Sequence, residues 1–414
     1  MKIEVVAIGD EILRGMTINS NATWISRLLF QKGYPVARHM TLPDDPSILS
    51  QGLQEALSRS DLVITTGGLG PTCDDRTRHI AADLFSSDFY FNQDIAADLT
   101  KRFGEALSSL KDQATVPSKA KILPNSIGTA PGLIFSEGGK TLILLPGVPS
   151  EMQQMVEGQV ISYLNQICPL RAQRGHIQIQ LCLLNENRVD PTLRELQKKF
   201  PDVDVGIYPG YGTLMVSLTS VVLDQLEAFK EALARHFEPY IFTSANGKIS
   251  EALLDWFVAE KRTLALAESC TGGLMAAQLT SIPGASNYFL GSCVVYSNEM
   301  KRDLLGVSEA TLQRTGAVSQ ETVTEMLLGV LEQTHADYAI AISGIAGPSG
   351  GSDLKPVGTM WAAMGKRGET PDVGTFLAKG TRETRTLLTT NLLLGALWRK
   401  LVKGIPPFPL YPQK

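Results

Sequence analysis

The N-terminal part of the chain alternates two hydrophobic patterns. Short, continuous apolar runs at 3–9, 61–68 and 141–147 are typical of strands that are buried on both faces. The segment 22–33 instead clusters its apolar residues on one helical face and ends at a glycine, which predicts an amphipathic helix. Because apolar strands separated by helices form parallel sheets with helices on both faces, we expect a three-layer α/β domain over residues 1–168.

The pattern changes between residues 170 and 245. Alternation of apolar and polar residues at 176–184 and 212–220 predicts strands, and a helical period at 190–200 and 223–237 predicts helices. These elements indicate a small α+β middle domain over residues 170–245, to which we assign no chemistry. It is a candidate spacer that also supports dimerisation.

From residue 250 the alternation of strands and helices returns. We expect helices at 250–261 and 319–334 and strands at 263–269, 292–298, 337–344 and 357–364. They predict a second α/β domain over residues 248–405, followed by a proline-rich tail at 406–414 without periodicity. The fold class is therefore α/β, with two three-layer domains of mainly parallel sheets joined by a small α+β middle domain.

Composition narrows the function classes. The 414 residues are 43% hydrophobic and 19% charged, with a formal net charge of −4, which argues against a dedicated nucleic-acid surface. The five cysteines are scattered without a CxxC pair, so neither a disulfide framework nor a zinc knuckle is indicated. No apolar run approaches the roughly eighteen residues that a membrane-spanning helix needs. We expect a cytoplasmic protein that binds neither membranes nor nucleic acid directly.

The segment "ALAESCTGG" at 265–273 is the first candidate site. An apolar strand stops at a polar, glycine-rich turn, and a helix pattern follows. The turn places Ser269 at the carboxyl end of a buried strand, where open α/β sheets bind ligands. The amides of Thr271, Gly272 and Gly273 could then stabilise an oxyanion or a phosphate. The alternative is a plain helix N-terminus with a serine or threonine cap.

A serine nucleophile needs a base. His335 lies just before a predicted strand and therefore at the opposite edge of the sheet, which disfavours a serine–histidine pair. Tyr296 and Asn298 lie at the end of the predicted strand 292–298, and Lys301 lies just past it, so all three belong to the correct edge. A lysine with a lowered pKa can accept the serine proton, and Tyr296 could relay a proton or orient the substrate. Lys301 could equally be a solvated surface lysine.

Two further segments belong to the same edge. The glycine-rich loop 343–351, with Gly344 and Gly347, follows a strand and suits a phosphate or an amide oxygen. Arg382 and Arg385 in "KGTRETR" could each clamp a phosphate, although on a helix they would be ordinary surface charges.

The N-terminal domain has three polar loops, at 9–24, 65–77 and 145–152, and each follows a predicted strand. They should meet at one sheet edge and form a nucleotide site. Glycine amides would hold a pyrophosphate, and Asp74 and Asp75 would hold a divalent metal, unless they only favour a helix dipole. The candidate residues of this site are Asp10, Glu11, Asn21, Gly67, Gly68, Gly70, Asp74, Asp75, Pro146 and Gly147.

The C-terminal motifs resemble those of the CinA C-terminal family. They are "AESCTGG", "VVYSNEMK", "GAVS", "SGIAGPSGG", "KPVGT" and the late arginine pair, and the resemblance covers most of residues 250–403. It implies metal-free hydrolysis of nicotinamide mononucleotide to nicotinic acid mononucleotide and ammonia. It further implies Ser269 as the nucleophile, Lys301 with Tyr296 as its activators, and an arginine of the last loop, Arg382 in preference to Arg385, on the phosphate.

The N-terminal motifs resemble the molybdopterin-binding fold of MoaB and MogA proteins and the N-terminal domain of CinA proteins. "KDQATVP" and "NSIGTAPG" extend this resemblance over most of the domain. It implies an ADP-ribose pyrophosphatase that depends on a divalent metal cation of unknown identity.

The leading hypothesis is a homodimeric, bifunctional enzyme of pyridine-nucleotide salvage whose substrates are nicotinamide mononucleotide and ADP-ribose. The alternatives are a non-catalytic partner protein in competence or recombination, and an N-terminal domain that binds molybdopterin.

Overall fold

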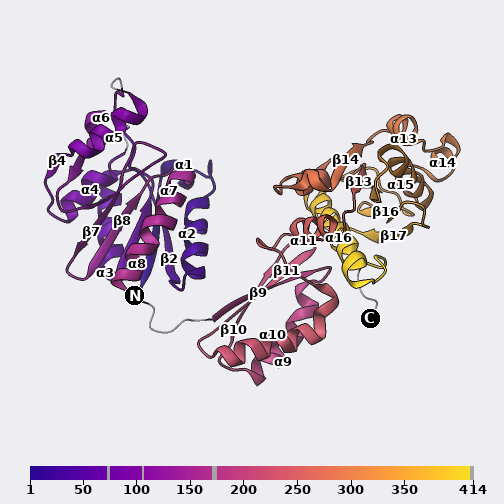
Figure 1. Cartoon of the computed structure of the whole chain (residues 1–414), viewed down its shortest axis with the longest axis horizontal. Coiled ribbons are helices and arrows are strands. Elements are labelled where there is room, and N and C mark those ends of the chain that lie inside the picture. The colour runs from indigo at the N-terminus through magenta and orange to yellow at the C-terminus, as the bar shows by residue number, and fades with distance from the viewer. Residues whose placement is uncertain (72–74, 105–106, 170–174, 411–414) are drawn as a thin grey trace. The chain divides into compact units, whose positions relative to one another are not determined.

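The computed structural model describes residues 1–71, 75–104, 107–169 and 175–410, and it divides into two compact units, 1–173 and 174–414 (Figure 1). Within the described ranges, no helix combines the length and the apolar character that crossing a bilayer requires. Each unit is described by itself below.

The first unit contains a six-stranded sheet in the order β2-β1-β3-β8-β7-β6. The strands β2, β1, β3 and β8 pair in parallel, and β7 pairs antiparallel with both β8 and β6. Its elements are β1 (Ile3–Ile8), α1 (Asp10–Leu13), α2 (Ser20–Gln31), β2 (Val36–Leu42), α3 (Pro46–Arg59), β3 (Leu62–Thr66), α4 (Thr77–Leu84), β4 (Phe89–Phe91), α5 (Gln93–Phe103), α6 (Leu110–Ala114), β5 (Thr115–Pro117), β6 (Lys121–Leu123), β7 (Gly132–Glu137), β8 (Lys140–Leu145), α7 (Pro149–Met155), a π-helical turn (Val156–Val160) and α8 (Ile161–Ile167).

Helices cover both faces of this sheet, as the sequence predicts. Residues of α2, α7 and α8 pack on one face in one apolar cluster, and residues of α3 and α4 pack on the other face in a second cluster. Along β1, Ile3 and Val5 belong to the first cluster, and Val6 and Ile8 belong to the second. The period of two therefore puts alternate residues of one buried strand into two different cores.

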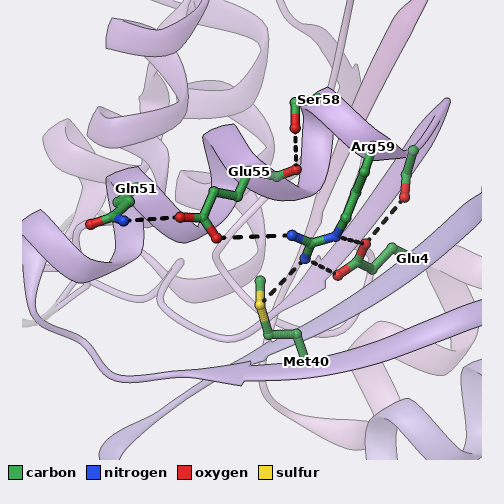
Figure 2. Close-up of polar contacts among 7 residues, drawn as sticks. Glu4, Met40, Gln51, Glu55, Ser58 and Arg59 are labelled. Atoms are coloured by element: carbon green, nitrogen blue, oxygen red, sulfur yellow. Dashed lines mark hydrogen bonds and ion pairs between the residues drawn. The ribbon is translucent and has the colours of Figure 1, made fainter.

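Glu4 interrupts the apolar side chains of β1 and is completely buried. Figure 2 shows how Arg59, the last residue of α3, reaches it: Nη2 donates to Oε1 at 2.6 Å and Nε donates to Oε2 at 3.0 Å. Ser60 Oγ donates a further hydrogen bond of 3.1 Å. This bidentate ion pair joins the start of β1 to the end of α3, at the sheet edge opposite the polar loops.

The second unit contains two sheets. Its elements are β9 (Gly175–Cys182), α9 (Glu186–Lys199), β10 (Asp204–Pro209), β11 (Thr213–Ser220), α10 (Leu223–Phe237), η2 (Glu238–Tyr240), β12 (Ile241–Phe242), α11 (Ile249–Ala259), β13 (Leu264–Glu268), α12 (Leu274–Thr280), η3 (Ala285–Asn287), β14 (Phe289–Val294), α13 (Asn298–Leu305), α14 (Glu309–Thr315), α15 (Gln320–Thr334), β15 (Tyr338–Gly344), β16 (Thr359–Lys366), β17 (Asp372–Leu377) and α16 (Arg382–Lys403).

The five-stranded sheet has the order β14-β13-β15-β16-β17 and separates two cores. Its central strands alternate large residues with alanine. Leu264, Leu266 and Ile340 face α11, α12 and α16, whereas Ala265 and Ala267 face α13 and α15. Small alanine side chains let α15 lie close to the sheet, and the larger residues fill the space beneath α16.

The middle segment forms the antiparallel sheet β10-β11-β9-β12, which has its own apolar cluster. It also packs on α16. Gly395 of α16 lies so close to Cys182 of β9 that a Cβ added at this glycine would be only 3.0 Å from the Cβ of Cys182. The proline-rich end after α16 is held as well: Arg399 Nη2 donates to the carbonyls of Pro406 and Pro407, and Leu410 is buried.

The α/β fold class is confirmed. Two details differ from the sequence-based expectation. Each large sheet has an antiparallel edge, formed by β7 and β6 in the first unit and by β16 and β17 in the second. The strand expected at 292–298 begins at Phe289 and ends at Val294, so Tyr296 and Asn298 lie beyond it.

Candidate functional sites

Ser269 lies in a tight turn between β13 and α12. Its amide donates to the carbonyl of Ile342 on the neighbouring strand at 3.1 Å, which fixes the residue where β13 ends. Gly272 and Gly273 follow with φ of +61° and +93°, a left-handed conformation that glycine adopts without strain. The turn therefore depends on both glycines, and the side chain of Ser269 is almost completely buried.

Lys301 reaches this turn from α13. Ser297 caps that helix by accepting a hydrogen bond from the amide of Met300, and one turn later the Lys301 side chain extends back toward the helix start. Its Nζ lies 3.1 Å from Ser269 Oγ, 2.9 Å from the carbonyl of Val295 and 3.2 Å from the carbonyl of Tyr296. The sequence-predicted pair of Ser269 and Lys301 is thus within hydrogen-bond distance.

The environment of Lys301 shifts its protonation equilibrium toward the neutral amine. The residue is only 1% exposed, and this burial lowers the pKa of the ammonium from its ordinary value of 10.5. A neutral amine has two N–H groups and one lone pair. Three carbonyl oxygens surround Nζ: those of Val295 and Tyr296 and, at 3.5 Å, that of Ser297. Two of them can accept the N–H groups of the amine, and its lone pair can then accept the proton of Ser269 Oγ. This arrangement can take the serine proton.

The amides of the turn are used differently from the sequence-based prediction. Glu268 is completely buried, and its Oε2 accepts from the amide of Gly273 at 3.1 Å. The amide of Gly272 donates to the carbonyl of Ser269 at 3.0 Å. In this structure both amides therefore already have acceptors within the turn, and their contact with an oxyanion or a phosphate stays a prediction. Thr271 is the remaining predicted donor, since no acceptor for its amide is found among the described residues.

Arg382 and Arg385 lie in the first turn of α16, not in a loop as expected. Arg382 donates to the phenol oxygen of Tyr296 at 2.6 Å and to the carbonyl of Gly347 at 2.8 Å. Arg385 donates to the carbonyls of Ala346 and Ala378 at 3.0 and 3.1 Å. The structure thus gathers both arginines beside the glycine-rich loop.

The phenol of Tyr296 contacts Arg382, whereas the contact with Lys301 comes from the Tyr296 main-chain carbonyl. Asn298 is exposed at the first position of α13. Gly344 ends β15 where a Cβ would lie 2.2 Å from the sulfur of Met360, so this glycine permits a close approach between strands. His335 precedes β15 and lies at the opposite edge of the sheet from Ser269, as expected.

In the first unit, the three predicted loops follow β1, β3 and β8, which are parallel neighbours, and they meet at one edge. They enclose a pocket of about 420 Å³. The sequence-predicted residues that line it are Glu11, Gly67, Gly68, Gly70, Asp75, Pro146 and Gly147. Asn21 supports its wall by donating to Thr66 Oγ1 at 2.9 Å and to the carbonyl of Gly147 at 2.8 Å.

Gly67 shows why this edge needs glycine. Its φ is +110°, and a Cβ there would lie 2.1 Å from the carbonyl oxygen of Ile8. Any larger residue would force the loop after β3 away from β1. Because Gly67 has no side chain, the ends of β1 and β3 can approach each other closely at the wall of the pocket.

Asp10 does not line the pocket. Its carboxylate accepts from Arg14 at 2.6 Å and from the amide of Asp44, so it closes the turn after β1. Asp74 lies outside the described residues. Within the described ranges, no group of three or more acidic, histidine or cysteine side chains is placed to hold a metal ion.

Sequence reasoning missed three buried or pocket-lining carboxylates: Asp44, Glu151 and Glu268. Asp44 follows β2, which is parallel to β1, so the strand-end rule could have identified it. Glu151 lies within the predicted polar loop 145–152 and lines the pocket. Glu268 ends an apolar strand, and a charged residue in a fully buried position is itself a signal.

Comparison with known proteins adds two family matches. Residues 246–400 match the model described as the CinA C-terminal domain, and residues 4–166 match a probable molybdopterin binding domain. A CinA-like protein of Dictyoglomus thermophilum is 34% identical over 95% of this chain and 98% of its own length. One of Chlorobium limicola is 35% identical over 98% and 99%. A crystal structure of CinA from Thermoplasma acidophilum, 37% identical, covers 39% of this chain and 96% of that chain with a TM-score of 0.37.

Proposed function

The chain belongs to the CinA family, and from that premise we propose that its C-terminal site hydrolyses the carboxamide of nicotinamide mononucleotide. The products would be nicotinic acid mononucleotide and ammonia. The observation that carries the proposal is the distance of 3.1 Å between Ser269 Oγ and the buried Nζ of Lys301. A desolvated lysine beside a serine is a base beside a nucleophile.

The proposed reaction has two steps. Ser269 Oγ forms a bond to the amide carbon while its proton passes to Lys301 Nζ, and the C–N bond breaks as that proton is returned to the leaving ammonia. Water then attacks the acyl-enzyme and gives one proton to Lys301 Nζ, which passes it to Ser269 Oγ as the ester bond breaks and nicotinic acid mononucleotide is released. The amide of Thr271 is the candidate donor to the developing oxyanion, because the amides of Gly272 and Gly273 already have acceptors.

The phosphate of the substrate would be held by Arg382. Its guanidinium donates to one neutral phenol and one carbonyl. A phosphate is a stronger acceptor than either and could displace them. Arg385 donates to two carbonyls and is the second candidate.

The test incubates the full chain with nicotinamide mononucleotide and EDTA and follows ammonia together with nicotinic acid mononucleotide. Wild type should release both in equal amounts, and Ser269→Ala should release neither. Ser281→Ala is the matched control, because that hydroxyl donates to the carbonyl of Gln278 at the end of α12. Equal rates in wild type and Ser269→Ala would refute the proposal.

A second function is favoured by the N-terminal pocket. We propose that it hydrolyses ADP-ribose to AMP and ribose 5-phosphate. Support comes from the glycine-rich loops and from four carboxylates in its lining: Glu11, Asp44, Asp75 and Glu151. Carboxylate oxygens are ligands that divalent cations prefer, and a bound cation would neutralise the diphosphate. Within the described ranges, no three acidic, histidine or cysteine side chains are placed to hold a metal ion. The cation would therefore need further oxygen ligands, from the diphosphate or from residues outside the described ranges.

This proposal is tested by following AMP release from ADP-ribose with and without added Mg²⁺ or Mn²⁺. Asp75→Asn should lower the rate, while Asp98→Asn, whose carboxylate pairs with Arg102 on α5, should not. Tight binding of a pterin without turnover of ADP-ribose would instead favour the molybdopterin-binding alternative.

A further inference from the structure

Glu268 is a buried carboxylate that the proposed chemistry does not use. Its Oε2 accepts from Thr271 Oγ1 at 2.8 Å and from the amides of Gly273 and Met275 at 3.1 Å each. Its Oε1 accepts from the amide of Ala276 at 3.0 Å and from Ser292 Oγ at 3.1 Å. One side chain therefore accepts five hydrogen bonds, which exceeds the roughly four lone-pair positions of a carboxylate.

These five donors come from three structural elements around Ser269. Thr271 and Gly273 belong to the turn itself, and Met275 with Ala276 begins α12. Ser292 lies on the neighbouring strand β14. Glu268 thus replaces the missing N-cap side chain of α12 and ties the turn to β14 at the same time.

The main chain of Glu268 extends the connection to Lys301. Its carbonyl accepts from the amide of Val295 at 2.8 Å, and the carbonyl of Val295 accepts from Lys301 Nζ at 2.9 Å. The amide of the next residue, Ser269, is fixed on β15. Glu268 is therefore bonded both to the turn that holds the nucleophile and to the strand end that holds its base.

All five donors to the carboxylate are neutral amides and hydroxyls. The positive end of the α12 dipole faces this carboxylate. The contacts found for the carboxylate do not include an ion pair with Lys301. The action of Glu268 on the site must then pass through geometry. A shift of about 1 Å between reacting groups can lower a rate by about 10²-fold.

We propose that Glu268 is a positioning residue that sets the distance between Ser269 and Lys301. This proposal rests on the serine–lysine site described above, and it assigns to Glu268 no contact with substrate.

The test replaces Glu268 by glutamine, which preserves the shape. The amide oxygen can keep the three donors at Oε2, but the new NH₂ group then faces the N–H of Ala276. We expect kcat for nicotinamide mononucleotide to fall about 10- to 100-fold while KM stays within about threefold, since only the relative placement of the reacting groups changes. A loss of fold alone would lower the amount of active enzyme and the melting temperature.

A second readout does not require turnover. A fluorophosphonate forms an O–P bond with Ser269 as its P–F bond breaks, fluoride leaves, and the serine proton passes to Lys301. The labelling rate, measured by mass spectrometry of the Ser269 peptide, should fall in proportion to kcat. If wild type is labelled at Ser269 but does not hydrolyse the nucleotide, the proposed function fails and the positioning role is still measured.

Glu251→Gln is the matched control, because Glu251 is also a buried carboxylate and accepts from the amide and side chain of Asn246. It should lower the melting temperature without changing the labelling rate. If Glu268→Gln does not fold, Ser292→Ala removes one donor and should slow labelling about threefold. Labelling of the folded variant at the wild-type rate, or no labelling of wild type at Ser269, would overturn the proposal.

Discussion

The two units treat a buried charge in opposite ways. In the first, Glu4 lies at the start of β1 and meets a cation, Arg59, in a bidentate pair. In the second, Glu268 ends β13 and Lys301 lies on α13. Both meet only neutral hydroxyls, amides and carbonyls among the partners found. Glu4 thus joins β1 to α3, whereas Glu268 and Lys301 surround the candidate nucleophile Ser269.

The physical reason lies in what each environment fixes. An ion pair holds both groups in their charged states, because losing either charge leaves the other buried and unpaired. Lys301 has no such partner ion among the contacts found, and its burial lowers its pKa. Lys301 can therefore exchange a proton with Ser269, whereas Glu4 is held by its contact with α3. Four substitutions test this comparison.

The largest expected effect is on activity in Lys301→Met. Removing a general base should lower kcat/KM for nicotinamide mononucleotide by about 10³-fold. In wild type, kcat/KM should rise with pH to a midpoint below 10.5, because the pKa of Lys301 is lowered by burial and only the neutral amine accepts a proton. Initial rates from pH 6 to 10 measure this limb, and the variant should lack it.

The same substitution, Lys301→Met, should also change how the stability of the chain depends on pH. Its pKa is lower in the folded than in the unfolded chain, so between those two values the unfolded chain binds more protons. Wild type should consequently gain stability relative to Lys301→Met as pH rises through that window. Lys366→Met, which removes an exposed lysine on β16, is the control. A pH-independent difference between wild type and Lys301→Met would mean that the buried lysine titrates normally.

Sequence reasoning could predict the pairing of Ser269 with Lys301 because both follow strands whose carboxyl ends share one edge. It could also predict the layered fold, because apolar strands separated by helices form a sheet that must be covered by helices on both faces. It could not predict that β16 runs opposite to β15, since an apolar run is compatible with either direction. Nor could it predict how Glu268 uses the turn amides, because that depends on one side-chain rotamer.

The second prediction concerns the first unit. Arg59→Met keeps the packing volume but leaves Glu4 without its cation, and breaking such a pair should lower the free energy of unfolding by about 2 kcal/mol. The value lies below that of a fully buried pair because the Arg59 side chain is 25% exposed. Urea unfolding followed by circular dichroism measures the loss.

Amidase activity should remain at the wild-type rate in Arg59→Met, since the pair lies in the other compact unit. Lys119→Met removes an exposed pair with Glu137 and should change stability by less than about 0.5 kcal/mol. Reduced amidase activity in folded Arg59→Met would mean that the Glu4–Arg59 pair affects the amidase site as well as stability, which contradicts the comparison.

The third prediction separates the two arginines of α16. Arg382→Gln should raise KM for nicotinamide mononucleotide about 10-fold, the loss expected for one charge-assisted contact, with little change in kcat. Nicotinamide riboside lacks the phosphate, so its hydrolysis should not respond to the substitution. If Arg385→Gln gives the larger rise instead, the phosphate contact belongs to Arg385.

The smallest expected effect is that of Tyr296→Phe, and it decides between two roles for one phenol. The resemblance to the family assigns Tyr296 to activation of the nucleophile. Among the hydrogen bonds found, however, the Tyr296 phenol contacts neither Ser269 nor Lys301, and it accepts from Arg382. If it only orients Arg382, the phenylalanine variant should raise KM about two- to fivefold and leave kcat unchanged. A fall in kcat of about 10²-fold, with the pH limb of Lys301 altered, would require the phenol to approach Lys301 when substrate is bound.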